Sequence, residues 1–405
     1  MKKRILSVFL TLVMVLCLAP MTTFAEGESE TATVTVASVQ ALIDALPDAS
    51  SIGTNDVAGV LTKLKAIDDA APRLSNDDYN KLKDNRYHNA IVQLQNLAVE
   101  VKNESELKQQ IAKGGSIKLS EGITLTEDLT VSSGVFLWGA SFNGDYGIII
   151  ETNAFLCECN SSNITITNNG GTVWCGSYKS VINQNGGVVY QASASDMIKN
   201  NGGTVNGGQS KSVISEGGVL FQVRATDGDI IMKGDGTVSY SFTENGDISN
   251  VGGTMNEVAA DSGSVENKPG GGSKIATIKK VTAANLYNDK GGTIEDCTVV
   301  SDIDNDGGTI KKGNFEKASK VENKDNGVIS GSTFGVNCRV YNSGTISDST
   351  FNGKVNYTGI FTNCIFSGTS AVTNEQGGTI GEGTFAGTVT NNGTISDGHM
   401  KVQGR

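Results

Sequence analysis

The sequence predicts an all-β protein, a parallel β-solenoid with about 17 residues per coil, preceded by a small three-helix module. Three observations lead to this prediction. A glycine-led repeat spans most of the chain, each repeat holds three short apolar segments, and helical apolar spacing is confined to residues 38–98. The composition agrees, because 51 glycines and only 4 prolines in 405 residues indicate many turns.

The repeat is clearest in residues 372–396, VTNEQGGTIGEGTFAGTVTNNGTIS, where one pattern occurs twice. Its glycine recurs at steps of 15 to 19 residues. The aligned glycines are Gly171, Gly187, Gly203, Gly218, Gly292, Gly308, Gly327, Gly344, Gly359, Gly378 and Gly393. Between Gly218 and Gly292 the pattern is less regular, and Pro269 indicates a loop. Such self-similarity is typical of stacked structural repeats.

Three apolar positions per repeat predict three short strands. The apolar residue after each glycine is followed five residues later by a second one, and the residue two before the second is always small, which suggests a tight inward corner. The second positions are Val299, Phe315, Phe334, Phe351, Phe366, Phe385 and Met400. Because equivalent residues of successive coils lie above one another at about 4.8 Å, we expect the phenylalanines to form an internal aromatic column.

An asparagine follows the third apolar position, two residues later in most repeats. We expect these asparagines to form a ladder of side-chain amides along the solenoid axis; tolerance of turns is the alternative explanation. The predicted ladder residues are Asn288, Asn305, Asn323, Asn342, Asn374 and Asn391.

The amino-terminal part of the chain has a different pattern. Lys2, Lys3 and Arg4 precede an apolar run that ends in a small-x-small motif, which predicts a signal peptide over residues 1–25 and a linker over 26–37. Helical spacing then predicts a three-helix module over 38–100, with Thr54 and Ser75 as N-caps. A capping helix over 101–112 is expected to cover the first coil of a solenoid that spans 113–405.

Charge and hydropathy restrict the partners. The exported chain would carry 29 basic and 43 acidic residues, so we expect no nucleic acid as partner. No segment after the leader is long and apolar enough for a membrane helix. The leader predicts export, and hence an extracellular or cell-surface location.

Residues 103–139, NESELKQQIAKGGSIKLSEGITLTEDLTVSSGVFLWG, resemble the entry into pectate-lyase-like right-handed β-helices. The GGTI and GTF units resemble those of secreted, surface-displayed repeat proteins of Gram-positive bacteria, and the helical module is similar to their spacer modules. The resemblance implies a right-handed coil, a bacterial envelope or extracellular location, and one of two functions. These are adhesion or display, and polysaccharide cleavage.

The sequence contains none of the residue sets that the resemblance associates with pectin cleavage. The candidate metal site is DIDNDGG, where Asp302, Asp304 and Asp306 have the spacing of a calcium loop, although solvated outward aspartates are the alternative. We therefore expect a non-catalytic protein of display, adhesion or glycan contact, with Ca²⁺ as a possible cofactor. A lyase or glycoside hydrolase with its site in residues 219–290, near Asp227 and Asp229, is the alternative.

Two further features leave alternatives open. Cys157, Cys159 and Cys175 lie about one coil apart, so a disulfide and free thiols are both compatible with the spacing. The sequence ends at GTISDGHMKVQGR within a repeat. Either the chain is a fragment of a longer protein, or an open strand edge pairs end to end with another copy, and we expect such self-association.

Overall fold

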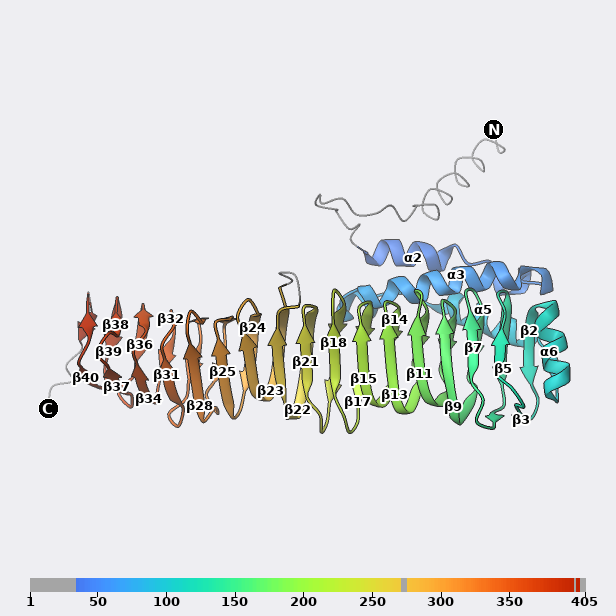
Figure 1. Cartoon of the computed structure of the whole chain (residues 1–405). Helices are drawn as coiled ribbons and strands as arrows, with labels where there is room; N and C mark the ends of the chain where they lie inside the picture. Colours follow the sequence, from blue (N-terminus) through green and yellow to red (C-terminus); the bar gives the residue numbers. More distant parts are fainter. Residues whose placement is uncertain (1–33, 271–274, 397, 401–405) are drawn as a thin grey trace, which may run out of the picture. The chain divides into compact units, whose positions relative to one another are not determined.

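The structure, a computed structural model, describes residues 34–270, 275–396 and 398–400 (Figure 1). The predicted signal peptide (1–25), most of the predicted linker and residues 401–405 lie outside the described residues. The helices and the solenoid that follow belong to one compact unit.

The chain forms a parallel β-solenoid of about 17 turns, as the repeat predicts. Each complete coil has three strand segments, which we call face I, face II and face III in chain order. Segments of successive coils pair in parallel with their equivalents, for example Ile294 with Ile310 on face I and Asn288 with Asn305 on face III. Parallel pairing also continues through residues 219–270 and 275–290, where the sequence pattern is less regular, with one register irregularity between Ala260 and Ser264.

Face I carries the segment after each repeat glycine. Its strands are β2 (Gly115–Leu119), β5 (Val135–Gly139), β8 (Phe155–Cys157), β10 (Thr172–Trp174), β12 (Val188–Tyr190), β14 (Thr204–Asn206), β16 (Val219–Phe221), β19 (Thr237–Ser239), the first parts of β22 (Thr254–Lys268), β23 (Thr277–Asp289) and β24 (Thr293–Val299), then β26 (Thr309–Lys311), β29 (Val328–Ser330), β32 (Thr345–Ser347), β35 (Ile360–Thr362), β38 (Thr379–Ile380) and β41 (Thr394–Ile395).

Face II carries the aromatic position. Its strands are β3 (Ile123–Thr124), β6 (Phe142–Asn143), the first parts of β9 (Asn160–Asn169), β11 (Ser177–Gln184), β13 (Ser193–Asn201) and β15 (Gln209–Glu216), then β17 (Arg224–Ala225), β20 (Phe242–Thr243), the middle parts of β22 and β23, the end of β24, β27 (Asn314–Phe315), β30 (Thr333–Phe334), β33 (Thr350–Phe351), β36 (Cys364–Phe366), β39 (Gly383–Phe385) and β42 (Gly398–Met400).

Face III carries the asparagine position. Its strands are β4 (Leu129–Val131), β7 (Ile148–Glu151), the last parts of β9, β11, β13 and β15, then β18 (Ile230–Lys233), β21 (Ile248–Val251), the last parts of β22 and β23, β25 (Asp302–Asp306), β28 (Lys320–Lys324), β31 (Arg339–Asn342), β34 (Lys354–Tyr357), β37 (Ala371–Asn374) and β40 (Thr388–Asn391).

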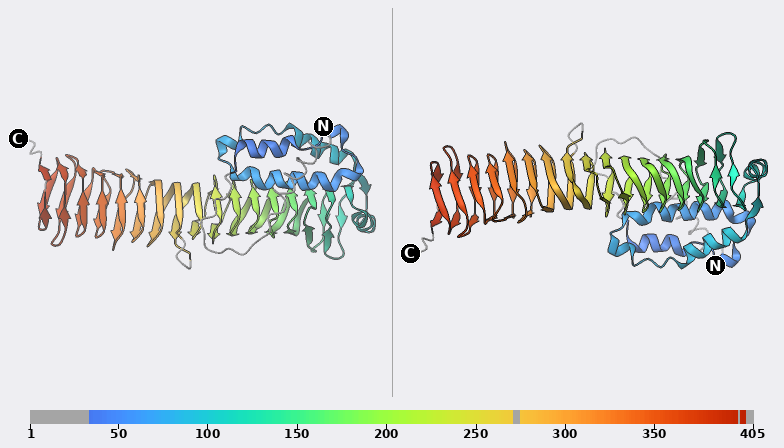
Figure 2. Two further views of the ribbon diagram at one scale, coloured as in Figure 1. Left: turned by 90° about the horizontal axis from the view of Figure 1, so that it is seen from above. Right: turned by 90° about the horizontal axis from the view of Figure 1, so that it is seen from below.

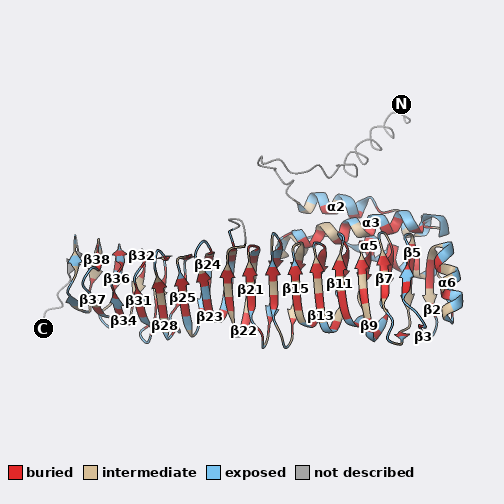
Figure 3. Ribbon diagram, viewed as in Figure 1, coloured by how far each residue is buried: buried red, intermediate tan, exposed pale blue. Residues whose placement is uncertain are grey.

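The interior is filled by one continuous cluster of buried side chains. Figure 3 shows buried residues on the strands along the solenoid. Alternation along each strand directs every second residue inward, as period-2 geometry requires. The predicted aromatic column is confirmed. The ring centroids of Phe315 and Phe334 lie 5.2 Å apart, and those of Phe334 and Phe351 lie 4.4 Å apart. It continues through Phe366 and Phe385, whose rings stack at 4.8 Å.

The corner between faces I and II explains the small residue in each repeat. Residues with left-handed backbone begin this corner, such as Asp296 (φ 56°) and Lys312 (φ 53°). The next residue points inward beside the aromatic column. At Gly313 an added Cβ would lie 2.1 Å from the ring of Phe315, so any larger side chain there requires that ring to move.

The amino-terminal end of the solenoid has an extra strand that the sequence pattern did not predict. Strand β1 (Val99–Val101) pairs in parallel with β2 and so extends face I by one strand. Helix α6 (Glu104–Lys113) follows directly, capped by the side chain of Asn103, and buries Leu107 and Ile111. Leu107 and Ile111 belong to the same buried cluster as the coils, so α6 covers the first coil.

The preceding segment contains α2 (Val36–Asp44), α3 (Val57–Ala70), the one-turn helix α4 (Asn76–Tyr79) and α5 (Asn85–Asn96), with short 3₁₀ turns η1 (Ala49–Ser51), η2 (Thr54–Asp56) and η3 (Ala71–Arg73). Ser75 caps α4 as predicted. The prediction for Thr54 is wrong. Thr54 lies inside η2, and the local cap contact instead runs from the Gly53 amide to the Asp56 carboxylate at 2.9 Å.

These helices lie along the outer side of face I, from β2 to β19, and leave the later coils uncovered (Figure 2). Specific contacts connect the two parts. Lys65 donates to the Gly186 carbonyl at 2.7 Å, Thr204 donates to Asp69 at 2.7 Å, and the Asn76 amide donates to the Tyr240 hydroxyl at 3.1 Å.

Candidate functional site

The six asparagines of the predicted ladder lie in one column on face III. Asn288 donates through Nδ2 to Oδ1 of Asn305 at 2.8 Å, and the same bond links Asn305 to Asn323 and Asn323 to Asn342 at 2.7 Å. Asn374 and Asn391 are linked at 2.6 Å. Each amide also donates to a backbone carbonyl, such as that of Gly308 for Asn305 or that of Ile360 in the next coil for Asn342. The amide bonds therefore tie successive coils together from Asn288 to Asn342 and from Asn374 to Asn391.

Sequence reasoning missed the first half of this column. Asn168 donates to Asn183 and Asn183 to Asn200, each at 2.8 Å, and Asn250 donates to Asn267 at 2.9 Å. The signal was present, because ITITNNGG, VINQNGG and MIKNNGG place an asparagine two residues after an apolar one. The column is interrupted where Ser215, Met232 and Tyr357 take the asparagine position.

The candidate calcium residues do not converge. Asp302, Asp304 and Asp306 alternate with the buried Ile303 and Asn305, so all three point outward along β25. Asp304 binds Lys324 of the next coil at 2.5 Å. In the parts of the chain that the structure describes, no group of three His, Cys, Asp or Glu side chains could hold a metal ion.

The other sequence candidates are also dispersed. Asp227 is exposed, and Asp229 accepts a hydrogen bond from the Asp247 amide at 2.9 Å. All six cysteines of the described residues are free thiols. Burial raises the pKa of Cys157 and Cys159 well above its ordinary value, and that of Cys175 to about 11, so these thiols are protonated near neutral pH.

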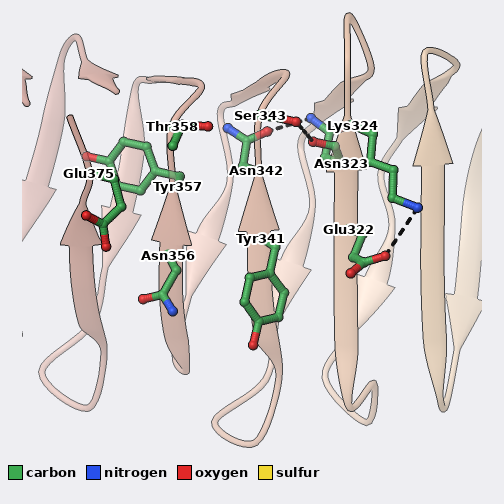
Figure 4. Close-up of a pocket in the computed structure, with 10 residues that line it drawn as sticks. All are labelled: Glu322, Asn323, Lys324, Tyr341, Asn342, Ser343, Asn356, Tyr357, Thr358 and Glu375. Atoms are coloured by element: carbon green, nitrogen blue, oxygen red, sulfur yellow. Dashed lines mark hydrogen bonds and ion pairs between the residues drawn. The ribbon is translucent and has the colours of Figure 1, made fainter. Parts of the chain in front are cut away.

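A shallow depression of about 280 Å³ lies on face III over β28, β31, β34 and the turn after β37 (Figure 4). It coincides with the interruption of the asparagine column at Tyr357. This ring is buried, packs edge-on against Phe361 at 4.4 Å, and its hydroxyl has no hydrogen-bond partner among the described residues. Burial raises the pKa of Tyr357, so its hydroxyl remains a neutral group that can donate a hydrogen bond.

The depression is lined by an exposed aromatic ring and by neutral polar side chains. Tyr341, which is 41% exposed, points outward from β31, and Asn356 lies beside it on β34. Ser343 and Thr358 follow at the corner, where Ser343 donates to the Asn323 carbonyl at 3.3 Å. Figure 4 shows Glu322 paired with Lys324 at one side.

Three cations border the depression on consecutive strands. Lys320, Arg339 and Lys354 occupy the same outward position in β28, β31 and β34 and are direct neighbours in register. Lys320 pairs with Glu322 at 2.5 Å. Among the described residues, neither Arg339 nor Lys354 takes part in an ion pair. In a chain of net charge −11, this is a local basic column with two cations available to a ligand.

This surface is chemically suited to a carbohydrate. A tyrosine ring offers an apolar face, asparagine, serine and threonine offer donors and acceptors to hydroxyl groups, and arginine offers a planar fork to a carboxylate or sulfate. The depression is shallow and crosses several neighbouring strands, which fits an extended polymer that lies across them.

No helix of the described residues has the length and apolar character of a membrane span. No family model and no curated protein matches this chain. A solved structure that matches is the crystal structure of a TibC-catalysed hyper-glycosylated TibA fragment, with 13% sequence identity and a TM-score of 0.38. That match covers 69% of this chain and 97% of the TibA chain. The function proposed below therefore depends on the residues of this chain.

Proposed function

We propose that the protein is an exported, surface-associated solenoid that binds an extracellular polysaccharide on face III and acts in adhesion or display rather than in catalysis. The observation that carries the proposal is that Arg339 and Lys354 lie beside the exposed ring of Tyr341 and take part in no ion pair among the described residues. The ligand class is a glycan with carboxylate or sulfate groups, because the unpaired cations attract anions that the rest of this acidic surface repels.

The asparagine column supports this function mechanically. A ligand that lies across several coils needs strands that hold their spacing, and the amide bonds connect the coils of Asn305, Asn323 and Asn342, up to the interruption of the column at Tyr357. Since Arg339, Tyr341 and Asn356 extend from strands and not from mobile loops, their relative positions are set by the ladder register. Little ordering is then required on binding.

The test is binding of the chain to immobilised polygalacturonate and to a neutral galactan, at several salt concentrations. We expect preference for the anionic polymer, weaker binding at higher salt, and a loss of about tenfold in affinity for Arg339→Ala and for Lys354→Ala. Tyr341→Ala should weaken binding by a similar factor without changing its salt dependence.

Lys311→Ala is the matched control, because Lys311 is an exposed lysine on the outer side of face I. It removes the same charge and should leave binding unchanged. Equal binding of both polymers, or an equal effect of Lys311→Ala, would contradict the assignment to face III. Steady formation of shortened or unsaturated products, abolished by Asp227→Asn or Asp229→Asn, would instead support polysaccharide cleavage.

A further inference from the structure

A second cavity, of about 210 Å³, lies between the helices and the outer side of face I, far along the chain from the polysaccharide surface. Three tyrosines contribute to its wall: Tyr79 from the end of α4, Tyr87 from α5 and Tyr190 from β12. Ile67 and Leu82 supply apolar surface. The volume is below the roughly 300–1,000 Å³ of sites for drug-sized ligands, so the cavity suits a small molecule.

Neighbouring rings hold the tyrosines in place. Tyr190 stacks on Trp174 with ring centroids 5.7 Å apart and 7° between the planes. Tyr79 packs against Phe221 at 5.6 Å, and Tyr87 meets His88 edge to face at 5.7 Å. Aromatic walls of this kind carry negative potential on their faces and attract cations.

One carboxylate, Asp84, lines this cavity, and the buried Asp68 is hydrogen-bonded to the Tyr87 hydroxyl but is not part of the lining. Asp68 of α3 is 4% exposed, and its Oδ1 accepts a hydrogen bond from the Tyr87 hydroxyl at 2.7 Å. Its Oδ2 is buried and has no hydrogen-bond partner among the described residues. Asp84, the residue before α5, lines the cavity and lies 3.4 Å from Nδ1 of His88.

No lysine or arginine of the described residues lines this cavity. Lys65 is directed to the Gly186 carbonyl at 2.7 Å, and Arg73 pairs with Asp69 at 3.4 Å. Ile67, Asp68 and Ala71 lie at the carboxyl end of α3, where the last backbone carbonyls carry partial negative charge. Aromatic faces, the carboxylate of Asp84 and a helix carboxyl terminus all favour the same sign of ligand charge.

We propose that this cavity binds a small alkylated ammonium ion, held by cation–π contact with Tyr79, Tyr87 and Tyr190 and by the negative charge of Asp84. The tyrosine faces and apolar residues contact the alkyl groups, and the carboxylate of Asp84 compensates the charge. Because two walls come from helices and one from the solenoid, a bound cation also links the helices to face I. This site is independent of the proposed polysaccharide surface.

The primary experiment is calorimetric titration of the unmodified chain with choline and, separately, with 3,3-dimethylbutan-1-ol, which has the same shape without the charge. We expect saturable one-to-one binding of choline and at least tenfold weaker binding of the neutral alcohol. Equal affinity for the two would overturn the assignment of a cation. No saturable binding of either would overturn the site.

Two variants locate the site. Tyr190→Leu keeps apolar volume but removes a ring, and Asp84→Asn keeps the size of the side chain but removes the charge. Each should weaken choline binding by about tenfold. Tyr287→Leu, at an exposed tyrosine of face III, is the matched control and should leave choline affinity unchanged. If Tyr190→Leu and Asp84→Asn bind choline as the unmodified chain does, the proposed cavity is wrong.

Discussion

The coils under the helices and the coils beyond them share one interior but differ on the outer side of face I. In the covered coils, Phe136, Phe155, Val188 and Phe221 are fully buried although they lie outside the cluster that fills the solenoid. They alternate with interior residues such as Leu137 and so point outward, against the helices.

In the uncovered coils the same outward positions hold residues suited to water. Thr309, Lys311, Ser330 and Ser347 occupy them, and Ile360, an exception, is 47% exposed. Apolar residues at the inward positions are therefore sufficient to form a coil, whereas the type of residue at the outward positions depends on whether another element covers that coil. An apolar outward column on a solenoid indicates a docked element.

The largest effect is expected from a charge in the shared interior. Phe351→Asp places a carboxylate in the aromatic column, where the rings of Phe334 and Phe366 leave it no partner, and should destabilise the protein by more than about 4 kcal/mol. Ile365→Asp, at a position 53% exposed on the next coil, is the control and should melt like the unmodified chain. Circular dichroism in the far ultraviolet distinguishes them, and equal melting would mean that the inward and outward positions are reversed.

A smaller effect should follow from changing the outward position of face I. Phe155→Ala opens a cavity under the helices and should reduce the free energy of unfolding by about 3–5 kcal/mol. The equivalent change in an uncovered coil, Ile360→Ala, should stay within about 0.5 kcal/mol. Denaturant unfolding measures both. Similar losses for the two variants would contradict the division into covered and uncovered coils.

The asparagine column lies on face III and should be insensitive to the helices. Asn305→Leu, in an uncovered coil, leaves the Asn288 amide without its acceptor and should destabilise the protein by about 2 kcal/mol. Asn183→Leu, in a covered coil, breaks the equivalent bond from Asn168 and should have the same effect. Asn326→Leu, at an exposed turn residue, is the control. A clearly larger loss for Asn183→Leu would show that the helices contribute to the column.

The smallest expected effect is a change in how the stability of the protein depends on pH. Burial raises the pKa of Asp68 to about 8, against the opposing hydrogen bond from Tyr87 and the charge of Lys65, with Asp69 acting in the same direction as burial. Since its ordinary pKa is 3.8, the folded chain retains this proton between pH 3.8 and about 8, while the unfolded chain has released it.

Stability from Asp68 is therefore fully present below pH 3.8 and is lost as pH rises through about 8. The slope is at most about 1.4 kcal/mol per pH unit. Asp68→Asn should flatten the dependence of the melting temperature on pH between 5 and 8 for the transition of the covered coils. Asp78→Asn, at an exposed carboxylate of the same helical segment, should leave the slope unchanged. An unaltered slope in Asp68→Asn would assign the pH dependence to other groups.

Much of the solenoid could be predicted because its determinants are local and repeated. Stacking places each residue on its equivalent, so Phe334 and Asn323 are specified by their positions within one repeat. The surface of Arg339, Tyr341 and Lys354 was not predicted. Arg339 and Tyr341 are separated by one buried residue, Lys354 lies 13 to 15 positions further along the chain, and only the ladder register places them side by side. The cavity of Tyr79, Tyr87 and Tyr190 was missed for the same reason, since its walls come from different elements.

The sequence by itself determined the coil length, the three strands, the aromatic column and the asparagine positions of the later coils, because a regular repeat imposes the same inward environment on each of its turns. The tertiary structure alone decided that the helices pack on face I rather than standing apart as a separate module, and it shows why Phe155 and Phe221 are apolar at outward positions. The physical reason is that an outward apolar residue is stabilised only by contact with a surface distant in sequence, and no local pattern states which surface that is.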